Sequence, residues 1–143
     1  MRLKKLISLI IKIILFPLPK SRLKIKLRLL AFQMEDNMPL RLLGCQLFLN
    51  EENISHGGIS GRPDQVYQTK RGELVIVDTK SHKIVTLTDQ IQLSLYAFIL
   101  SRKGFNVSSN AYIRYCDNNF RVKYKRIPLL SPALSQELLN HYY

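Results

Sequence analysis

The stretch GRPDQVYQTKRGELVIVDTKSHK, residues 61–83, is the part of this chain that decides its fold. It contains an apolar run from Leu74 to Val77 that continues directly into Asp78 and Lys80. A charge beside a buried strand is unfavourable by several kcal/mol unless it finds a partner or a metal. We therefore expect Asp78 and Lys80 to meet other charged groups where this strand ends.

The same stretch predicts two strands, Ile59–Thr69 and Glu73–Lys80, joined by a short turn that contains glycine. Asp78 and Lys80 are two residues apart, so their side chains project from one face of the second strand. Asp64 follows a Gly/Pro turn at the end of the neighbouring hairpin strand and is expected to come close to Asp78 across the ladder. Two adjacent carboxylates repel each other and raise one pKa, unless a divalent cation neutralises them.

Oxygen ligands of this kind suit Mg²⁺ or Mn²⁺, and the backbone carbonyl of Thr79 is a further ligand within reach. Lys80 would then stand beside the attacking water, where it could orient the water or stabilise the charged phosphate. The alternative is a plain ion pair between Asp78 and Lys80 at the end of a strand, without a metal.

A helix is predicted from about Asp89 to Lys103, with Thr86 or Thr88 as its N-terminal cap. Gln92 and Tyr96 are one turn apart and therefore share a face of this helix. They mark either the solvent edge of the helix or a pair of hydrogen-bond donors to a phosphate chain.

Together, Gly61-x-x-Asp64, Asp78-x-Lys80 and Gln92-x-x-x-Tyr96 resemble the PD-(D/E)xK nuclease superfamily. Within it they look most like the RecB-like exonuclease branch, which includes the small CRISPR-adaptation exonucleases. The resemblance covers about residues 56–116. It implies an α/β fold with a restriction-endonuclease-like core, in which helices flank a mixed β-sheet of about five strands.

The resemblance also implies that Mg²⁺ or Mn²⁺ assists the hydrolysis of phosphodiester bonds in DNA. Carried over to this chain, it makes Asp64 and Asp78 metal ligands and Lys80 the catalytic lysine. Gln92 and Tyr96 become substrate contacts. Arg62, inside the first motif, is a further candidate for substrate binding.

The family usually supplies one more metal ligand, a Glu or His from an upstream helix. The candidates here are Glu35, Glu51, Glu52 and His56, and none of them stands in an obvious motif. His56 precedes two glycines, which favours a plain loop residue over a ligand. The sequence does not identify this further metal ligand. The alternative function is therefore an inactive nuclease fold that serves as a nucleic-acid-binding or assembly subunit.

The composition is that of a globular protein, with 46% apolar and 22% charged residues in 143. The two cysteines, Cys45 and Cys116, form no CxxC pair. We therefore expect no disulfide framework, no structural zinc and no iron–sulfur cluster, and we expect no small-molecule cofactor. Cysteine usage of this kind favours a reducing, cytoplasmic compartment.

Most of the net charge of +12 belongs to the N-terminal segment, because residues 1–34 contain nine Lys or Arg and no acidic residue. The other 13 basic and 10 acidic residues leave a charge of only +3. Such a segment attracts a polyanion, either a nucleic acid or an anionic membrane surface. We expect a basic helical segment over 1–34 and a nuclease-like domain over 35–143, within a single domain overall.

Residues 1–16 predict a basic amphipathic helix, with Lys5, Ser8 and Lys12 on one face and Pro17 just after it. Its apolar run is shorter than the roughly 20 residues that span a bilayer. We favour packing of this helix against its own domain. The alternative is that residues 1–30 dock on a partner protein or on an anionic membrane, which would place the protein peripherally at the inner face of a membrane.

The rest of the chain predicts further elements, which are a helix from Ser21, a strand over 40–50, a loop over 51–58, a hairpin of strands 110–116 and 120–128, and a last helix over 132–141.

Overall fold

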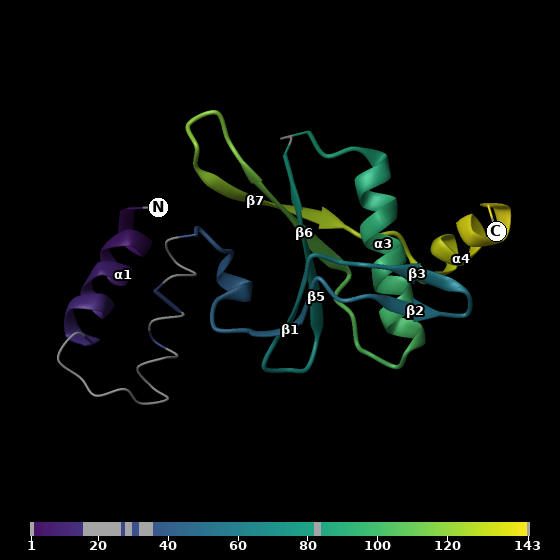
Figure 1. Ribbon diagram of the computed structural model, residues 1–143, viewed down its shortest axis with the longest axis horizontal. Helices are drawn as coiled ribbons and strands as arrows, with labels where there is room; N and C mark the ends of the chain where they lie inside the picture. Colours follow the sequence, from purple (N-terminus) through teal and green to yellow (C-terminus); the bar gives the residue numbers. More distant parts are fainter. Residues whose placement is uncertain (1, 16–26, 28–29, 32–35, 82–83, 143) are drawn as a thin grey trace.

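The computed structural model describes residues 2–15, 27, 30–31, 36–81 and 84–142, and a mixed sheet of five strands forms its centre (Figure 1). The strands, in spatial order, are β1 (Gln46–Asn50), β4 (Gln65–Gln68), β5 (Leu74–Lys80), β6 (Asn110–Cys116) and β7 (Val122–Pro128). β5 and β6 run parallel, and the other neighbours are antiparallel. With helices flanking this sheet, the predicted α/β fold with a mixed five-stranded sheet is confirmed.

The parallel pair requires a crossover connection, which the helix α3 (Leu87–Arg102) supplies. Thr86 caps α3, because its hydroxyl oxygen accepts a hydrogen bond from the Asp89 amide. The Asp89 carboxylate accepts one from the Thr86 amide in return, so the two residues form a capping box. α3 lies across one face of the sheet (Figure 1).

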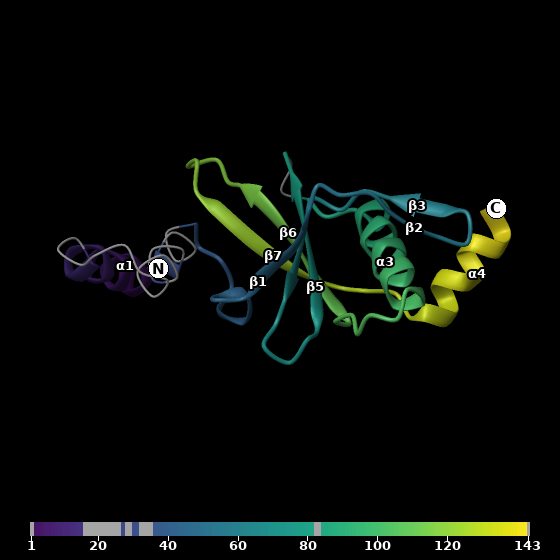
Figure 2. The same cartoon turned by 60° about the horizontal axis from the view of Figure 1, so that its bottom comes forward.

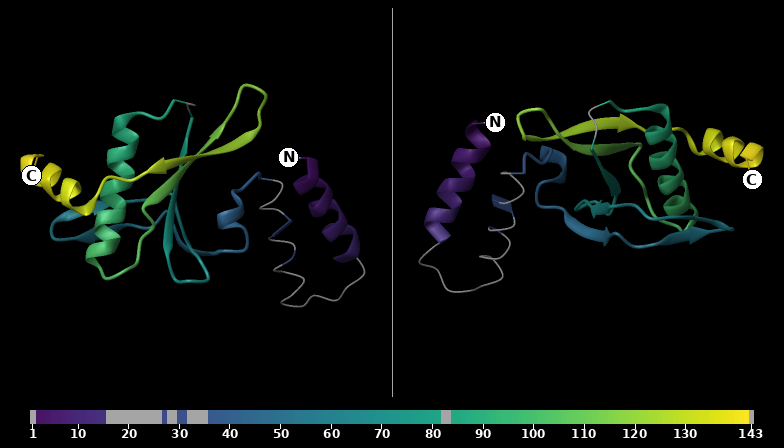
Figure 3. Two further views of the ribbon diagram at one scale, coloured as in Figure 1. Left: turned by 180° about the vertical axis from the view of Figure 1, so that it is seen from behind. Right: turned by 45° about the horizontal axis from the view of Figure 1, so that its top comes forward.

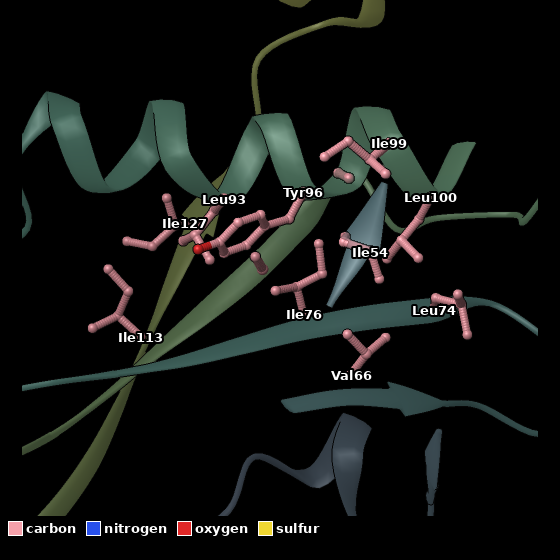
Figure 4. Packing of buried hydrophobic residues seen from close by; sticks show 12 residues of the cluster. Ile54, Val66, Leu74, Ile76, Leu93, Tyr96, Ile99, Leu100, Ile113 and Ile127 are labelled. Atoms are coloured by element: carbon pink, nitrogen blue, oxygen red, sulfur yellow. The ribbon is translucent and has the colours of Figure 1, made fainter. Parts of the chain in front are cut away.

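β5 is the central strand and is covered on both faces. Leu74 and Ile76 pack under α3, where Leu93 and Tyr96 lie between the helix and the sheet (Figure 4). Val75 and Val77 project from the opposite face, against Met38, Leu42 and Cys45. All four apolar residues of β5 are fully buried. Burial on both faces explains why this strand has a continuous apolar run and no alternation.

The prediction of one strand over Ile59–Thr69 was wrong, because the chain changes sheets within it. Ile59–Gly61 forms β3, which pairs with β2 (Ile54–His56) in a hairpin beside α3, whereas the later residues form β4 (Figure 1). Pro63 lies at the break and has no N–H to donate to a ladder. The predicted loop over 51–58 was correspondingly wrong where it contains β2.

The predicted strand over 40–50 is likewise interrupted. Leu40–Leu42 forms a short 3-10 helix, η1, and only β1 is extended. Gly44 lies between them with φ +75°, a left-handed conformation that glycine adopts without a steric penalty. The turn lets η1 insert Leu42, which is fully buried, against the face of the sheet opposite α3.

The helices α1 (Arg2–Leu15) and α4 (Pro132–Tyr142) lie at opposite ends of the molecule (Figures 2 and 3). The predicted hairpin after α3 and the final helix are both confirmed, and Ser131 caps α4 by accepting a hydrogen bond from the Leu134 amide. The helix predicted from Ser21 falls mostly on residues outside the described part of the chain.

α1 contributes no described residue to the two buried clusters. Its Leu3, Leu6, Leu9 and Ile10 are 45–67% exposed, so the prediction that this helix packs into its own domain was wrong for these side chains. Its described link to the domain is a hydrogen bond of 3.1 Å from Lys4 Nζ to the Met38 carbonyl. Within the described residues, no helix has the length and apolar character to cross a membrane.

Candidate active site

Asp64 and Asp78 face each other where the β4–β5 ladder ends. The last ladder pair is Gln65 with Val77, so the next position on each strand brings the two aspartates opposite one another. Asp64 Oδ2 accepts a hydrogen bond of 2.7 Å from the Thr79 amide. Asp78 is 3% exposed, which makes it a buried carboxylate beside a second carboxylate.

The surroundings of Asp78 disfavour its negative charge. Burial raises the pKa of Asp78, Lys80 opposes this shift, and the neighbouring charge of Asp64 raises the pKa further. Lys80 Nζ lies 2.8 Å from Asp78 Oδ2, outside the alignment of a hydrogen bond, and no other described group donates to this oxygen. A buried oxygen without a hydrogen bond therefore lies next to a second carboxylate.

Lys80 joins the aspartates to α3. Its Nζ donates a hydrogen bond of 3.0 Å to Gln92 Oε1 and lies 3.8 Å from Asp89 Oδ1. Burial lowers the pKa of Lys80, but the attraction of Asp78 and Asp89 outweighs it and raises the pKa above the usual value. Lys80 is therefore an ammonium ion at neutral pH, suited to stabilise negative charge and to donate hydrogen bonds.

Gln92 and Tyr96 continue this chain of contacts, since Gln92 Nε2 donates a hydrogen bond of 2.7 Å to the Tyr96 hydroxyl. Burial raises the pKa of Tyr96, although Gln92 opposes the shift, so the phenol keeps its proton. The Tyr96 ring packs against Gly61, where a Cβ atom would lie 2.5 Å from Tyr96 Cε1. Glycine at 61 is thus required for the position of the ring.

The backbone N–H and C=O groups of Thr79 lie on the side of β5 where Asp64 is found. In an extended strand the N–H and C=O of one residue point to the same side. Because the Thr79 N–H is bonded to Asp64, its carbonyl oxygen also lies on the side of β5 from which Asp64 approaches. Two carboxylates and one carbonyl are thus available as oxygen donors.

A cavity of about 550 Å³ opens next to these donors, on the side of the sheet away from α3. Asp64, Thr79 and Glu51 line it together with Arg114 and Tyr124. The cavity leaves room for another group beside Asp64 and Thr79, on the face of the sheet opposite Lys80, Gln92 and Tyr96. Within the described residues, no three His, Cys, Asp or Glu side chains gather as a ready metal site.

The structure places the other predicted site residues as follows. His56 pairs with Ile59 at the tip of the β2–β3 hairpin, which crosses α3 and extends away from the end of β5 (Figure 1). Arg62 is exposed and its Nε donates a hydrogen bond of 2.7 Å to the Glu51 carbonyl. Glu52 is exposed, and Glu35 lies outside the described residues. Of the three candidates within the described residues, Glu51 is the one that shares a cavity with Asp64.

The sequence interpretation missed two acidic residues near the site. Asp89 lies beside Lys80, and the spacing of the Thr86–Asp89 capping box was the available signal, although it predicted only a helix start. Asp36 accepts hydrogen bonds from Arg114 Nη2 at 2.6 Å and from the Tyr124 hydroxyl at 2.6 Å, at one wall of the cavity. No local signal predicts contacts across about 80 residues.

A comparison with known families covers the sheet and the helix around Asp64, Asp78 and Lys80. A model of the PD-(D/E)XK nuclease superfamily matches residues 16–139. The chain belongs to this superfamily. The match covers α3 and all five strands of the sheet.

Other comparisons with this PD-(D/E)XK protein are less informative. One solved structure, titled "Crystal structure of SSO0001", is 17% identical with a TM-score of 0.42 and covers 81% of this chain. The alignment spans 55% of that protein, so this chain matches about half of its length. No curated protein matches the sequence.

Members of the PD-(D/E)XK superfamily generally use Mg²⁺ or Mn²⁺. The residues present fit such an ion, because Asp78 is a buried carboxylate whose Oδ2 is ion-paired to Lys80 and makes no well-aligned hydrogen bond with a described residue. Asp64 and the Thr79 carbonyl add hard oxygen donors, which both ions prefer. A cation here would also remove the repulsion that raises the pKa of Asp78.

Proposed function

We propose that this protein is a divalent-metal-dependent nuclease that hydrolyses phosphodiester bonds in DNA, acting as an exonuclease similar to the RecB-like branch. The observation that carries the proposal is the placement of Asp64 and Asp78 side by side, with Lys80 ion-paired to Asp78. Membership of a nuclease superfamily supports phosphodiester hydrolysis as the reaction.

In this proposal Asp64, Asp78 and the Thr79 carbonyl hold Mg²⁺ or Mn²⁺. The bound cation supplies positive charge for the phosphate and a water of lowered pKa. Glu51 is the upstream candidate supported by position, because it lines the cavity that Asp64 and Thr79 also line. His56 has no such support, since the hairpin that carries it leads away from the end of β5.

Lys80 and its partners act on the substrate. Lys80 is held by Asp78 and Gln92 and is protonated, so it stabilises the negative charge that grows on the phosphate oxygens. The Tyr96 hydroxyl accepts a hydrogen bond from Gln92 and donates to no described residue. Its own proton therefore remains for a phosphate oxygen. Arg62 lies farther out and braces the Glu51 backbone, with its guanidinium in solvent.

The test is a digestion assay with linear duplex, covalently closed circular and single-stranded DNA in Mg²⁺, Mn²⁺ or EDTA. We expect metal-dependent loss of linear DNA and an intact circle, because an exonuclease requires an end. Asp78→Asn should abolish cleavage, and Glu137→Gln, which alters an exposed acid on α4, should leave it unchanged. Cleavage of the circle would replace the exonuclease proposal with an endonuclease.

The alternative is an inactive nuclease fold that binds nucleic acid as a subunit. It is favoured by one observation, which is that two carboxylates and no third ligand side chain gather at the site within the described residues. Tight DNA binding with no cleavage in either metal would support this alternative over the enzyme.

A second function is favoured by α1, in which Leu3, Leu6, Leu9 and Ile10 are exposed and the charged residues are all basic. We propose that α1 binds the surface of an anionic membrane, at the cytoplasmic face. The protein should sediment with phosphatidylglycerol vesicles and not with phosphatidylcholine vesicles. Leu6→Glu should abolish this binding, and equal sedimentation of the variant would contradict it.

A further inference from the structure

The β6–β7 hairpin extends the sheet beyond α3. Its turn end projects past the helix in both views, so α3 leaves this part of the sheet uncovered (Figures 1 and 2). Cross-strand neighbours share a face, and the register therefore sets two rows on the α3 side of the sheet. The rows are Asp78–Ile113–Lys125 and Lys80–Tyr115–Lys123.

The outer members of both rows are lysines. Lys125 is exposed and makes no hydrogen bond or ion pair with any described residue. Lys123 is half-exposed, and its Nζ lies 3.3 Å from Asp117 Oδ2. With strands about 4.8 Å apart, the Lys125 backbone lies roughly 10 Å from that of Asp78, the rise of about three nucleotides in one strand. The lysines are therefore within reach of a nucleic-acid strand whose phosphate lies at Asp78.

The turn of the hairpin presents an aromatic side chain to solvent. Phe120 is 91% exposed, and its amide donates a hydrogen bond to the Asp117 carbonyl. Asp117 Oδ1 accepts hydrogen bonds from the amides of Asn119 and Arg121, both at 2.9 Å. The turn is thus held by several hydrogen bonds, with the ring of Phe120 outside the fold.

Phe120 is also in an unfavourable backbone conformation for its type. Its φ is +58°, in the left-handed region where a hairpin turn normally uses glycine. The side chain gains no burial that would compensate. The turn uses only the backbone of Phe120, and its side chain contributes nothing to packing, so the ring is suited to a contact with another molecule.

Tyr115 is a second aromatic residue of this hairpin. It lies between Lys80 and Lys123 in the second row, is half-buried, and its hydroxyl makes no hydrogen bond with a described residue. Aromatic rings that alternate with basic side chains are the pattern by which proteins hold unpaired nucleic acid, because bases stack on the rings and phosphates meet the cations.

We propose that the β6–β7 hairpin is an arm that holds an unpaired nucleic-acid strand next to the active site. Phe120 and Tyr115 stack on bases, and Lys123 and Lys125 bind phosphates. The proposal rests on the proposed nuclease function and adds the form of the substrate, which is a single strand at the point where it meets the arm.

The test measures binding by fluorescence anisotropy in EDTA, which prevents cleavage. The probes are a labelled single-stranded oligothymidylate and a blunt duplex of the same length. We expect the single strand to bind more tightly. Phe120→Gly should weaken single-strand binding about tenfold and yet raise Tm, because glycine relieves the left-handed conformation. A purely structural role for Phe120 would not produce this opposite pair of effects.

Lys125→Ala and Arg126→Ala form a matched pair on one strand. Arg126 is opposite Tyr112 and therefore projects from the other face of the sheet. Lys125→Ala should weaken binding and reduce the slope of log affinity against log salt by about 0.7, the value of one lost phosphate contact on a single strand. Arg126→Ala should change neither quantity.

Unchanged single-strand binding in Phe120→Gly would contradict the proposed role of the hairpin. A loss of affinity in Arg126→Ala equal to that in Lys125→Ala would contradict it as well. Equal affinity of the wild type for the duplex and the single strand would contradict the proposal that the hairpin binds unpaired nucleic acid. A wild type that binds the single strand but cleaves no DNA in Mn²⁺ would contradict the proposed nuclease function and leave the arm standing. Metal-dependent cleavage with no effect of these variants would contradict the arm alone.

Discussion

Asp78 combines two properties that rarely occur together, since it is almost fully buried and lies next to a second carboxylate. Its position after an apolar run made it a candidate from the sequence. The sequence did not indicate that the Thr79 amide would hold Asp64 Oδ2 and leave Asp78 Oδ2 without a hydrogen bond. The two carboxylates differ in their hydrogen bonds although they lie opposite each other, one on each strand, at the end of the β4–β5 ladder.

Asp78→Asn should remove the response of stability to metal. In the wild type, Mn²⁺ at about 100 times its Kd should add about 2.7 kcal/mol to the free energy of unfolding. For a chain of this size that corresponds to a rise in Tm of roughly 5–10 °C. Differential scanning fluorimetry with and without Mn²⁺ measures it, with Glu137→Gln as the control. An equal Tm rise in Asp78→Asn would remove this aspartate from the metal site.

Lys80→Ala should separate metal binding from turnover. The lysine contacts Asp78 and Gln92 and is a cation, so its loss should lower cleavage by about 100-fold or more while the Mn²⁺-dependent rise in Tm remains. Single-turnover cleavage at saturating Mn²⁺, combined with the fluorimetry, measures both quantities. Loss of the Tm response together with wild-type turnover would show that Lys80 serves the metal rather than the phosphate.

At the scale of elements, the site depends on how β3, β4 and α3 meet. The chain leaves β3 at Gly61 and enters β4 at Gln65, and this short connection places Asp64 at the end of β5. Gly61 lies against the ring of Tyr96, so α3 and β3 approach more closely than any other residue at 61 would allow. The first motif therefore has a packing role for its glycine as well as a chemical role for its aspartate.

Gly61→Ala should displace the Tyr96 ring. The new Cβ atom would meet Cε1 and Cδ1 of the ring at 2.5 and 2.7 Å, which requires α3 or the ring to move. Overpacking of this kind lowers stability by about 1–3 kcal/mol. We expect a lower urea midpoint and weaker cleavage. Ser60→Ala, an exposed residue on the same strand, is the control, and an unchanged midpoint in Gly61→Ala would contradict this packing.

At the scale of the whole molecule, the described part of α1 stands apart from the buried clusters. Deletion of residues 1–19 should therefore leave a protein that unfolds cooperatively, because the described residues of both clusters remain. The deletion also removes four of the nine N-terminal basic residues, so binding to anionic vesicles should be lost. Circular dichroism melting and vesicle sedimentation check the two results. An insoluble or non-cooperative product would show that the first helix is part of the core after all.

The two faces of the sheet also predict different reactivity of the thiols. Cys45 is buried on the face opposite α3, and burial raises its pKa, although Arg41 and Lys70 oppose the shift. Less of it is thiolate at a given pH, and reagents reach it poorly. At pH 8 we expect Cys116, which is exposed, to react quickly with Ellman's reagent and Cys45 slowly. In Cys116→Ser the fast phase should disappear, and a persisting fast phase would contradict the burial of Cys45.

The sequence by itself determined the fold class and most of the motif set. β5, the hairpin after α3 and the caps of α3 and α4 follow from local patterns, since an apolar run, an alternation or a capping residue acts within a few positions. The break at Pro63, the 3-10 turn before β1 and the presence of β2 depended on which sheet each segment joined. Domain boundaries and the roles of the site residues remain predictions.

Only the tertiary structure decided which side chains share one place. The ladder between β4 and β5 joined Asp64 to Asp78, and the crossover brought Asp89 to Lys80 and Gln92. It also set Lys125 in line with Asp78 across three strands. These contacts depend on the register and twist of the sheet, which arise from the packing of both buried clusters together and from no single stretch of the chain.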